Sequence, residues 1–391
     1  MMSVLSELLE RGKFKWLNLV AVVYDDGNVK QIQTYKQLFT IAEKVSDALR
    51  KKLDSNLVIA ICRNTDLLTP AILCGSIYDM RSNDVVLLCS PLTFDPSIVE
   101  IFITLTSGAS LLIVPDHIKL KTKEILPIIY RRNRVTVIQA TPSLIQRIHP
   151  SDLRNTILSR SSSLRILALG GEKFPPLNKI REWRAPNNKT KFINLFGITE
   201  VSCWSFYHCL NDEKFWCDSE DVPLGIPLAQ STYKIVNEEG VEVLEGEGKL
   251  YLGGYDRLCM VDEEILIFKS EKLQNFRDSG DIVRIDCERR IFYVGRHDRQ
   301  VKRNGCRLNL EEIEKIILSE SQVSDCKAVI DDGRLVVFVI PKQDMEIDRI
   351  IEYLQSIIER KLPRHYIPDN IVPVQDFPIT KHVPSQIIHS Y

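Results

Sequence analysis

Short apolar runs and amphipathic segments alternate along the first half of the chain. Leu57–Cys62, Leu111–Pro115 and Leu164–Leu169 are almost continuously apolar and are typical of strands buried in a sheet. Between such runs, apolar residues recur at helical spacing, as they do from Leu38 to Leu49. This β-α order predicts a parallel or mixed sheet with helices on its faces. The same pattern predicts strands at Leu19–Tyr24, Val85–Cys89, Val135–Gln139 and Phe192–Leu195, and helices at Asp66–Gly75, Lys121–Arg132 and Thr141–Ile148.

Polar residues at the expected helix starts predict caps. Thr141 precedes Pro142 and has the place of an N-cap, and Ser97 and Glu100 have the spacing of a capping box. In the last part of the chain, Asn309 is expected to cap a helix. These caps fix where the three helices should begin.

Beyond Pro223 the pattern changes to alternation with a period of two residues, which predicts a small antiparallel sheet or barrel. From Arg296 to Tyr391, a capped helix, a hairpin and a second helix predict a separate α+β domain. The strands expected in the small sheet are Ser231–Val236, Val241–Leu244, Gly248–Gly253, Asp281–Asp286 and Ile291–Val294. The elements expected in the last domain are the helix Leu310–Ser319, the hairpin Cys326–Ile330 with Arg334–Ile340, and the helix Ile347–Ile358.

The composition is that of an ordinary globular protein. The chain has 391 residues, 44% of them hydrophobic, and a formal net charge of −1, which argues against nucleic acid as a partner. Its ten cysteines include no Cys-x-x-Cys pair, so we expect reduced thiols in a cytoplasmic protein rather than a zinc site. The apolar run Trp16–Val23 is too short to cross a membrane, and no membrane partner is expected.

Two motifs that follow buried strands carry candidate chemistry. Gly170-Gly171-Glu172 follows the strand Leu164–Leu169, and its glycines would let the backbone approach a flat ring closely. In the second motif, Asn194-Leu-Phe-Gly-Ile-Thr-Glu200, the ring of Phe196 could face the other side of the same ligand. Thr199 and Glu200 offer oxygen atoms suited to phosphate and Mg²⁺. Together they predict a nucleotide across strand ends; the alternative is an ordinary loop and a helix cap.

The order of seven motifs resembles the adenylate-forming superfamily, which includes acyl-CoA synthetases, adenylation domains of nonribosomal peptide synthetases and luciferases. The motifs are Phe94-Asp-Pro-Ser97, Gly170-Gly-Glu172, Asn194-Leu-Phe-Gly-Ile-Thr-Glu200, Phe276-Arg-Asp-Ser-Gly-Asp281, Gly295-Arg-His-Asp-Arg-Gln-Val-Lys302, Gly305-Cys-Arg-Leu308 and Leu362-Pro-Arg-His-Tyr-Ile-Pro368. The resemblance implies an α/β fold in two domains. Residues 1–295 would form a large domain of mixed sheets with flanking helices and a small β-barrel-like part, and residues 296–391 a small mobile α+β domain.

The resemblance also implies roles for individual residues. Thr199 would contact phosphate, Glu200 would hold Mg²⁺, and Lys302 would serve the second half-reaction, so these three are the candidate catalytic residues. Asp298 would be the hinge, and Asp95 would bind the ammonium group of the substrate. The residues implied in nucleotide binding are Gly170, Gly171, Glu172, Asn194, Phe196, Gly197, Thr199, Asp281 and Arg296.

The implied reaction is ATP-dependent activation of a small carboxylic acid to an acyl-adenylate, followed by thioester formation. Because fatty-acid-activating members generally lack the aspartate at position 95, we favour an amino acid over a fatty acid, and the resemblance implies beta-alanine as the candidate. ATP and Mg²⁺ are the implied cofactors, and the thiol would belong to coenzyme A or to the phosphopantetheine of a carrier protein in trans. Structural alternatives remain: Asp95 as a helix cap, Asp281 as a hairpin-end residue, and Arg296 with Asp298 as a local ion pair.

Two features of the superfamily are missing from the sequence. No Ser/Thr/Gly-rich loop ending in lysine lies between Leu57 and Ser97, and residues 75–79 resemble a junction across which a segment has been removed. Near the C-terminus, the position of the expected lysine falls on Pro384, and Lys381 is three residues early. The alternative function is therefore a catalytically impaired adenylate-binding homologue or a truncated isoform. We also expect residues 19 to 90 to be poorly protected, because a buried strand there would lose its neighbours.

Overall fold

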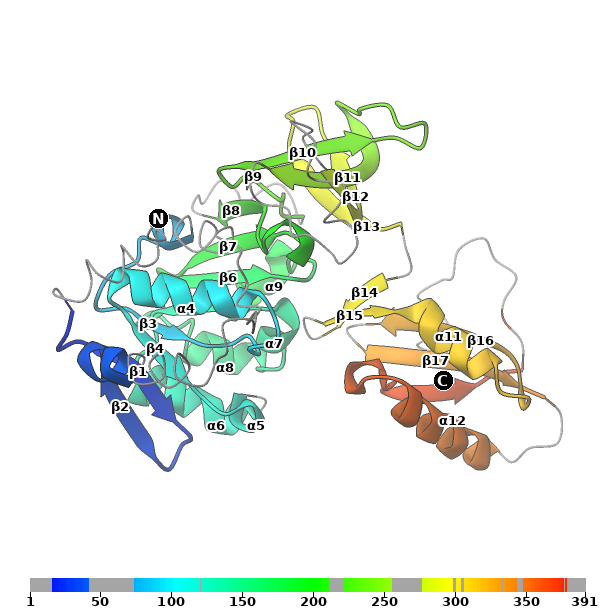
Figure 1. Cartoon of the computed structure of the whole chain (residues 1–391), viewed down its shortest axis with the longest axis horizontal. Helices are drawn as coiled ribbons and strands as arrows, with labels where there is room; N and C mark the ends of the chain where they lie inside the picture. Colours follow the sequence, from blue (N-terminus) through cyan, green and yellow to red (C-terminus); the bar gives the residue numbers. More distant parts are fainter. Residues whose placement is uncertain are drawn as a thin grey trace, which may run out of the picture. The chain divides into compact units, whose positions relative to one another are not determined.

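The computed structural model divides the chain into two compact units, residues 1–295 and 296–391 (Figure 1). Each unit has its own sheets and its own buried apolar core. The structure describes residues 16–41, 74–119, 121–210, 221–254, 276–297, 300–303, 306–331, 334–342, 347–375 and 377. The expected strand Leu57–Cys62 and almost all of the expected helix Asp66–Gly75 lie outside these residues.

The first unit is organised around a nine-stranded sheet in the order β2-β1-β4-β3-β5-β6-β7-β8-β9. The central strands β1, β4, β3, β5, β6 and β7 run parallel. At the edges, β2 pairs antiparallel with β1, β8 pairs antiparallel with β7, and β9 pairs antiparallel with β8. The mixed α/β sheet expected from the sequence is confirmed. Its strands are β1 (Val20–Asp25), β2 (Lys30–Thr34), β3 (Val85–Leu87), β4 (Ser110–Ile113), β5 (Val137–Ala140), β6 (Ile166–Gly170), β7 (Lys191–Phe196), β8 (Phe206–Leu210) and β9 (Ile226–Pro227).

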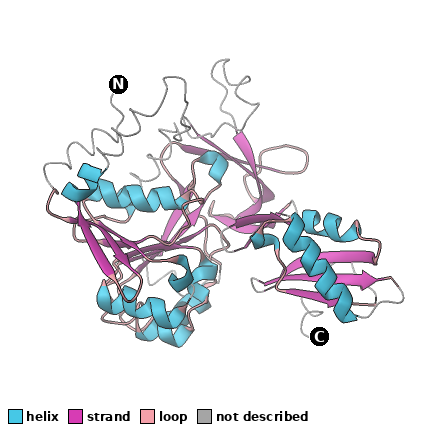
Figure 2. Cartoon of the chain, turned by 60° about the horizontal axis from the view of Figure 1, so that its bottom comes forward, coloured by secondary structure: helices cyan, strands magenta, loops and turns pink. Residues whose placement is uncertain are grey.

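Both faces of this sheet are buried. Successive side chains of a strand point to opposite faces, so Leu167 of β6 enters one core and its neighbour Ala168 enters the other. Helix α4 covers one face and α5 to α9 cover the other (Figure 2). The helices are α4 (Pro96–Ser107), α5 (Asp116–Lys119), α6 (Thr122–Leu126), the π-helix η2 (Pro127–Arg132), α7 (Pro142–Gln146), α8 (Pro150–Asn155) and α9 (Leu177–Trp183).

One expected helix differs from the sequence prediction. The segment Lys121–Arg132 forms the short helix α6 followed by the π-helix η2, and the change falls at Pro127. Proline has no amide hydrogen to continue the α-helical ladder. The helical period of the apolar residues was recognisable, but the change of helix type was not.

The first strand of the sheet has neighbours on both sides. β1 pairs with β2 in a hairpin and with β4 in parallel, where Val22 opposes Leu111. The buried hydroxyl of Tyr35 also donates to the carbonyl of Ala109 at 2.8 Å. The strand expected to lose its neighbours, Leu57–Cys62, lies outside the described residues, so poor protection across residues 19 to 90 stays a prediction.

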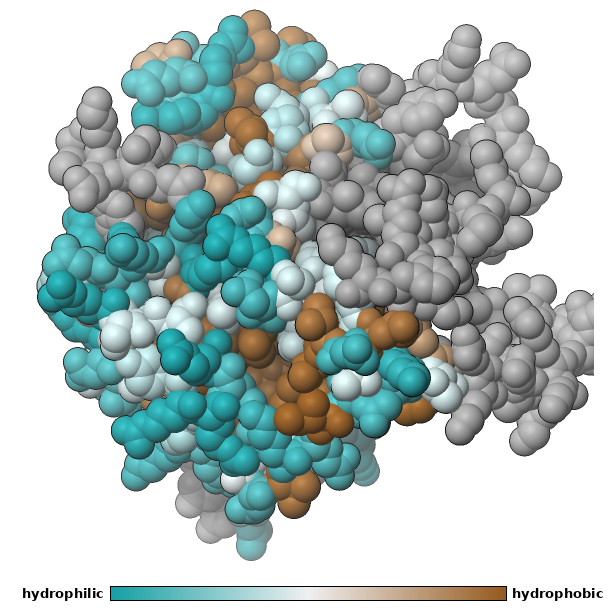
Figure 3. Space-filling view, turned by 90° about the vertical axis from the view of Figure 1, so that its left-hand side faces the viewer, coloured by the Kyte–Doolittle hydropathy of each residue, from teal (hydrophilic) through white to brown (hydrophobic). Residues whose placement is uncertain are grey.

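The edge strand β2 and its turn expose apolar side chains. Val29 is 49% exposed and Ile32 is 52% exposed. Figure 3 views the side of the molecule that carries β1 and β2, where apolar patches interrupt a largely hydrophilic surface. On β2 itself, Lys30 and two glutamines accompany Ile32, and charged or polar residues are common on sheet edges that must resist pairing with other chains.

A second, four-stranded sheet completes the first unit, in the order β10-β11-β12-β13. Its core is shared with Phe196 and Phe206, which come from β7 and β8. The expected strand Val241–Leu244 is wrong: only Glu242 forms an isolated bridge, with Val236. The strands are β10 (Ser231–Val236), β11 (Gly246–Gly254), β12 (Phe276–Ile285) and β13 (Ile291–Arg296).

The second unit is the expected α+β domain. Two amphipathic helices pack against a three-stranded sheet in the order β16-β17-β18, and the side chain of Asn309 caps α11 by accepting from the Glu311 amide at 2.9 Å. A separate hairpin, β14 with β15, precedes α11. The elements are β14 (Gln300–Arg303), β15 (Cys306–Asn309), α11 (Leu310–Leu318), β16 (Val323–Asp331), β17 (Arg334–Pro341), α12 (Ile347–Lys361), the 3₁₀ turn η5 (Arg364–Tyr366) and β18 (Asn370–Pro373).

Candidate functional site

The carboxyl ends of β3, β5, β6 and β7 lie along one edge of the large sheet because these strands are parallel. The chain passes from β3 to β4 on one side and continues through β5, β6 and β7 on the other, so the order of the sheet switches between β3 and β5. Open α/β sheets bind ligands at such a switch point. We call the segments that leave this edge the edge loops: residues 88–95, 141–143, 170–172 and 197–205.

Three of the edge loops meet at Gly171. This glycine has φ +81°, a left-handed conformation that favours glycine. A Cβ atom at this position would lie 3.6 Å from Cγ2 of Thr141 and 3.7 Å from Cζ of Phe94. The structure therefore brings together motifs that lie far apart in the sequence.

Two other glycines accommodate the fourth edge loop. A Cβ atom on Gly170 would lie 2.6 Å from Cη2 of Trp204, and one on Gly197 would lie 2.0 Å from the carbonyl oxygen of Cys203. Contacts this short exclude any larger residue without movement of the chain. The space beside Gly170 is thus occupied by the ring of Trp204, a residue that the sequence analysis did not single out.

Asp95 lies at the start of α4 but does not cap it. Its side chain is half-buried, its backbone is already helical, and it makes no capping hydrogen bond. The interpretation of Asp95 as a helix cap is therefore wrong. The capping box expected for Ser97 and Glu100 is also wrong, because Ser97 lies within α4 and the carboxylate of Glu100 accepts hydrogen bonds from Cys89 and Ser90 instead.

Glu172 caps a helix of a neighbouring loop. Its carboxylate accepts from the amide of Ser143 at 2.9 Å and from the Ser143 hydroxyl at 2.8 Å. The expected cap of the same helix, Thr141, makes no capping bond, and its hydroxyl lies 3.1 Å from the Ser143 hydroxyl. A carboxylate from another loop therefore makes the capping bond that the local sequence predicted for Thr141.

Asn194 and Phe196 are largely enclosed by the protein. The amide nitrogen Nδ2 of Asn194 donates to the carbonyl of Pro223 at 2.9 Å. Phe196 is 9% exposed, and its ring centroid lies 6.3 Å from those of both Phe206 and Tyr293. These contacts fix the end of β7 beside the four-stranded sheet.

Thr199 and Glu200 occupy the fourth edge loop, in the 3₁₀ turn η3 (Thr199–Val201). Thr199 is exposed and Glu200 is half-buried. The next two residues, Ser202 and Cys203, have φ values of +56° and +70°. Such conformations are costly for residues other than glycine and cluster at functional sites.

Asp281 lies within β12 at an irregularity in the ladder with β11. Its side chain is 1% exposed, and its amide donates to the hydroxyl of Ser279 at 3.1 Å. The preceding Gly280 has φ +76°. Asp281 is not at the end of the hairpin, so that structural alternative is wrong, and bulges of this kind often re-aim a side chain next to a site.

The remaining candidate residues lie at the boundary between the units, where β13 ends, and in the second unit. Arg296 ends β13, and its guanidinium lies 3.5 Å from the side-chain oxygen of Gln300. Lys302 lies on the hairpin strand β14, where its backbone pairs with that of Arg307. Asp298 and the ion pair considered for it lie outside the described residues, as do Lys381 and Pro384.

Sequence reasoning missed a buried polar network next to Asp95. Burial raises the pKa of Glu100 from 4.5 to about 7, although the Ser90 hydroxyl and the amides of Ser90 and Cys89 favour its ionised form. Burial also raises the pKa of Tyr78, whose hydroxyl donates to Gln139 at 2.9 Å. The available signal was a glutamate within the otherwise apolar stretch Ile98–Ile103.

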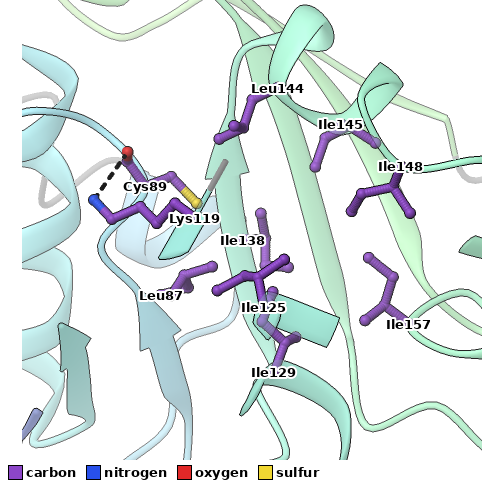
Figure 4. Close-up of a pocket in the computed structure, with 10 residues that line it drawn as sticks. All are labelled: Leu87, Cys89, Lys119, Ile125, Ile129, Ile138, Leu144, Ile145, Ile148 and Ile157. Atoms are coloured by element: carbon purple, nitrogen blue, oxygen red, sulfur yellow. Dashed lines mark hydrogen bonds between the residues drawn. The ribbon is translucent and has the colours of Figure 1, made fainter. Parts of the chain in front are cut away.

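A small apolar cavity lies on the other face of the sheet from α4 (Figure 4). Its volume is about 30 Å³, which is room for about one water molecule and too little for a nucleotide. The amine of Lys119 lies 3.5 Å from the carbonyl of Cys89 at one side of it. The lining side chains include Leu87, Ile125, Ile138 and Ile145, which belong to the core below α5 to α9.

The described part of the chain holds no group of three or more His, Cys, Asp or Glu residues that could bind a metal by themselves. Mg²⁺ commonly uses only one or two carboxylates together with substrate phosphates and water, so a single residue such as Glu200 fits that ion. Within the same residues, no helix is both long and apolar enough to cross a membrane.

Comparison with known proteins shows which chains this sequence is similar to. The chain is 39% identical over 311 residues to the beta-alanine-activating enzyme of Mus musculus, an alignment that covers 78% of this chain. The chain spans 28% of the length of that relative.

Solved structures show the same fold. The Vibrio cholerae adenylation domain AlmE, in complex with glycyl-adenosine-5'-phosphate, superposes with a TM-score of 0.75 at 18% identity, and covers 97% of this chain and 96% of its own. Holo-PA1221, a nonribosomal peptide synthetase protein with adenylation and carrier domains, superposes with a TM-score of 0.71 at 17% identity. The match covers 96% of this chain and 82% of the PA1221 chain.

Family models match both units. The model described as AMP-binding enzyme C-terminal domain matches residues 312–382, and the model described as AMP-binding enzyme matches residues 62–259. Since the second of these covers half of the chain and includes all four edge loops, the chain belongs to the AMP-binding enzyme family.

Proposed function

We propose that this chain activates a small amino acid, with beta-alanine as the first candidate, by joining its carboxylate to the AMP part of ATP. The observation that carries the proposal is the placement of Asp95: a half-buried carboxylate that caps no helix, next to Phe94, whose ring approaches Gly171. A carboxylate in this position suits the ammonium group of an amino acid. The beta-alanine-activating relative supports the choice of substrate.

In the proposed reaction, a carboxylate oxygen of the amino acid attacks the α-phosphorus of ATP, and the bond to the bridging oxygen breaks to release pyrophosphate. Asp95 would hold the ammonium group, so that the carboxylate is presented in one orientation. Thr199 would donate a hydrogen bond to phosphate, and Glu200 would hold Mg²⁺. That ion would offset negative charge on the phosphates.

The other predicted residues would complete the site. Asp281 would accept the two ribose hydroxyls, since a carboxylate has two acceptor oxygens. Arg296 would contact ribose or phosphate, and Asp298 would act as the hinge of the second unit. Lys302 would face the second step, in which a thiol attacks the acyl carbon and releases AMP. The candidate nucleotide contacts remain Gly170, Gly171, Glu172, Asn194, Phe196 and Gly197.

The thiol would come from a carrier protein or from coenzyme A. The carrier-containing structure of PA1221 supports the first choice. No residue of this chain is required to supply the thiol in the proposed reaction.

A second candidate function is adenylate binding without activation. It is favoured by the sequence, which has no lysine-ending phosphate loop between Leu57 and Ser97 and has Pro384 where a catalytic lysine is expected. Loss of one charge-stabilising group costs about 3–4 kcal/mol of transition-state stabilisation, so two losses would leave weak activity or none.

Exchange of labelled pyrophosphate into ATP separates these functions. The first predicts exchange that requires beta-alanine, exceeds that with propionate or a fatty acid, and is lost in Asp95→Ala. Exchange that prefers a fatty acid, or that is unaffected by Asp95→Ala, would contradict it. The second predicts no exchange but measurable AMP binding by calorimetry.

A further inference from the structure

Glu100 binds the start of the edge loop that carries Asp95. Its side chain is completely buried on α4. One carboxylate oxygen accepts from the amides of Cys89 and Ser90, at 2.8 and 3.2 Å, and the other accepts from the Ser90 hydroxyl at 2.5 Å. These bonds attach the loop, where it leaves β3, to the helix that follows it.

Gln139 holds the other end of the same loop. Its side-chain nitrogen donates to the carbonyl of Pro96 at 3.2 Å and lies 3.5 Å from the Glu100 carboxylate. Tyr78 fixes the orientation of this amide, because its hydroxyl donates to the Gln139 oxygen. The loop from Ser90 to Asp95 is therefore attached at both ends through one buried network.

Such a network needs a reason beyond packing. Burial of a carboxyl group is costly unless hydrogen bonds compensate for it, and the other inward side chains of α4 include the apolar Val99 and Ile103. An apolar residue at position 100 would fill space but could not bind the amides of Cys89 and Ser90. We therefore interpret the network as holding the loop in position.

We propose that Glu100 is the positioning residue for recognition of the substrate ammonium group. Its hydrogen bonds to Cys89 and Ser90 hold the loop and thereby determine the position of Asp95. This inference rests on the function proposed above for Asp95. Glu100 itself does not contact the substrate. Its loss should weaken recognition of the ammonium group more than it weakens binding of the nucleotide.

Calorimetric titration of the whole chain tests this without relying on catalysis. The probes are AMP and two non-hydrolysable acyl sulfamoyl adenosines, one with a beta-alanyl and one with a propanoyl group, which differ only in the amine. In the wild-type chain the beta-alanyl compound should bind at least tenfold more tightly than the propanoyl compound. Glu100→Ala should reduce this ratio at least tenfold and change the AMP affinity by less than threefold.

Two variants exclude general destabilisation. Glu100→Gln keeps one oxygen for the two amides and an NH₂ group for the Ser90 hydroxyl, so it should retain the ratio within about threefold. Thr104→Ala removes the hydrogen bond from the Thr104 hydroxyl to the Glu100 carbonyl on the same helix and leaves the loop unchanged. This variant should also retain the affinity ratio. A ratio unchanged in Glu100→Ala, or reduced equally in Thr104→Ala, would overturn the proposal.

The outcomes also separate this inference from the proposed function. If the wild-type chain binds AMP but does not distinguish the two acyl compounds, the proposed substrate class is wrong. If it distinguishes them, Asp95→Ala abolishes the difference and Glu100→Ala does not, then only the role of Glu100 is wrong. Amide exchange gives an independent readout: Cys89 and Ser90 should be protected in the wild type and in Glu100→Gln, and should exchange at least tenfold faster in Glu100→Ala.

Discussion

Glu172 accepts hydrogen bonds from both the amide and the hydroxyl of Ser143, and so joins the loop after β6 to the first turn of α7. The two residues are 29 positions apart in the sequence. The bond satisfies one of the amides that every helix start leaves without an intrahelical partner. Two of the four edge loops are thereby connected by the protein's own side chains.

Glu172→Ala should destabilise the first unit by about 1–2 kcal/mol, since it removes a helix cap that is also a charged hydrogen-bond acceptor. Urea unfolding in the absence of nucleotide measures this effect. Glu182→Ala, on the exposed side of α9, is the matched control and should change stability by less than about 0.5 kcal/mol. Equal stability of the two variants would contradict the assigned bond.

Gly197→Ala should prevent the fourth edge loop from packing, because the new Cβ would lie 2.0 Å from the carbonyl oxygen of Cys203. We expect a loss of at least about 3 kcal/mol, larger than for most substitutions. Gly295→Ala meets no atom within 4 Å and should be close to neutral. Thermal unfolding of both variants checks the difference, and similar melting temperatures would refute it.

Stability should depend on pH through Glu100. Burial raises the pKa of its carboxyl group from 4.5 to about 7 in the folded chain, and Lys119, whose charge lowers it, only partly opposes this. The folded state therefore holds the proton more tightly than the unfolded state. The stabilisation is complete below about pH 4.5 and is lost as the pH rises through about 7, a change on the order of 3 kcal/mol.

Glu100→Gln removes this titration and provides the reference. The unfolding free energy of the wild type, relative to that of Glu100→Gln, should decrease as the pH rises from about 5 to about 8. Tyr78 and Cys89, which also face Glu100, have pKa values raised well above their usual ones and stay neutral over that range. Parallel pH profiles for the two chains would show that Glu100 does not titrate there.

Asp84 should be one of the most sensitive polar positions of the first unit. It is 2% exposed, and its carboxylate lies 2.6 Å from the guanidinium of Arg165 and 2.8 Å from the hydroxyl of Thr136. Asp84→Ala leaves the Arg165 charge without this partner and should cost about 3 kcal/mol. Arg81→Ala removes one partner of the exposed Asp79–Arg81 pair and should have a much smaller effect on stability. Urea midpoints compare the two, and equal losses would contradict the assignment.

Much of the fold could be predicted from the sequence because parallel strands are buried on both faces and appear as apolar runs. Leu164–Leu169 predicted β6 for this reason. The prediction failed at Val241–Leu244, where apolar and polar residues alternate but the two end residues are 61% and 59% exposed. Alternation indicates that a segment could form a strand, but only a paired neighbour makes it one.

The motifs predicted some of the contacts between the edge loops, but not how the loops are held. Gly171 lies beside Phe94 of another motif, and also beside Thr141, which the sequence analysis singled out only as a helix cap. The bonds of Glu100 and Glu172 could not be foreseen, because their partners lie on other loops and the local sequence offered nearer alternatives. Local capping rules gave the wrong partner in both cases, since the fold supplied a donor or an acceptor from a distance.

The central claim is that the four edge loops form one site for an aminoacyl-adenylate. Amide exchange of the whole chain, with and without the beta-alanyl sulfamoyl adenosine, tests it most directly. We expect protection together in residues 88–95, 141–143, 170–172 and 197–205, with protection of residues 88–95 weakened in Asp95→Ala. Protection confined to other segments, or no change at saturating ligand, would contradict the claim.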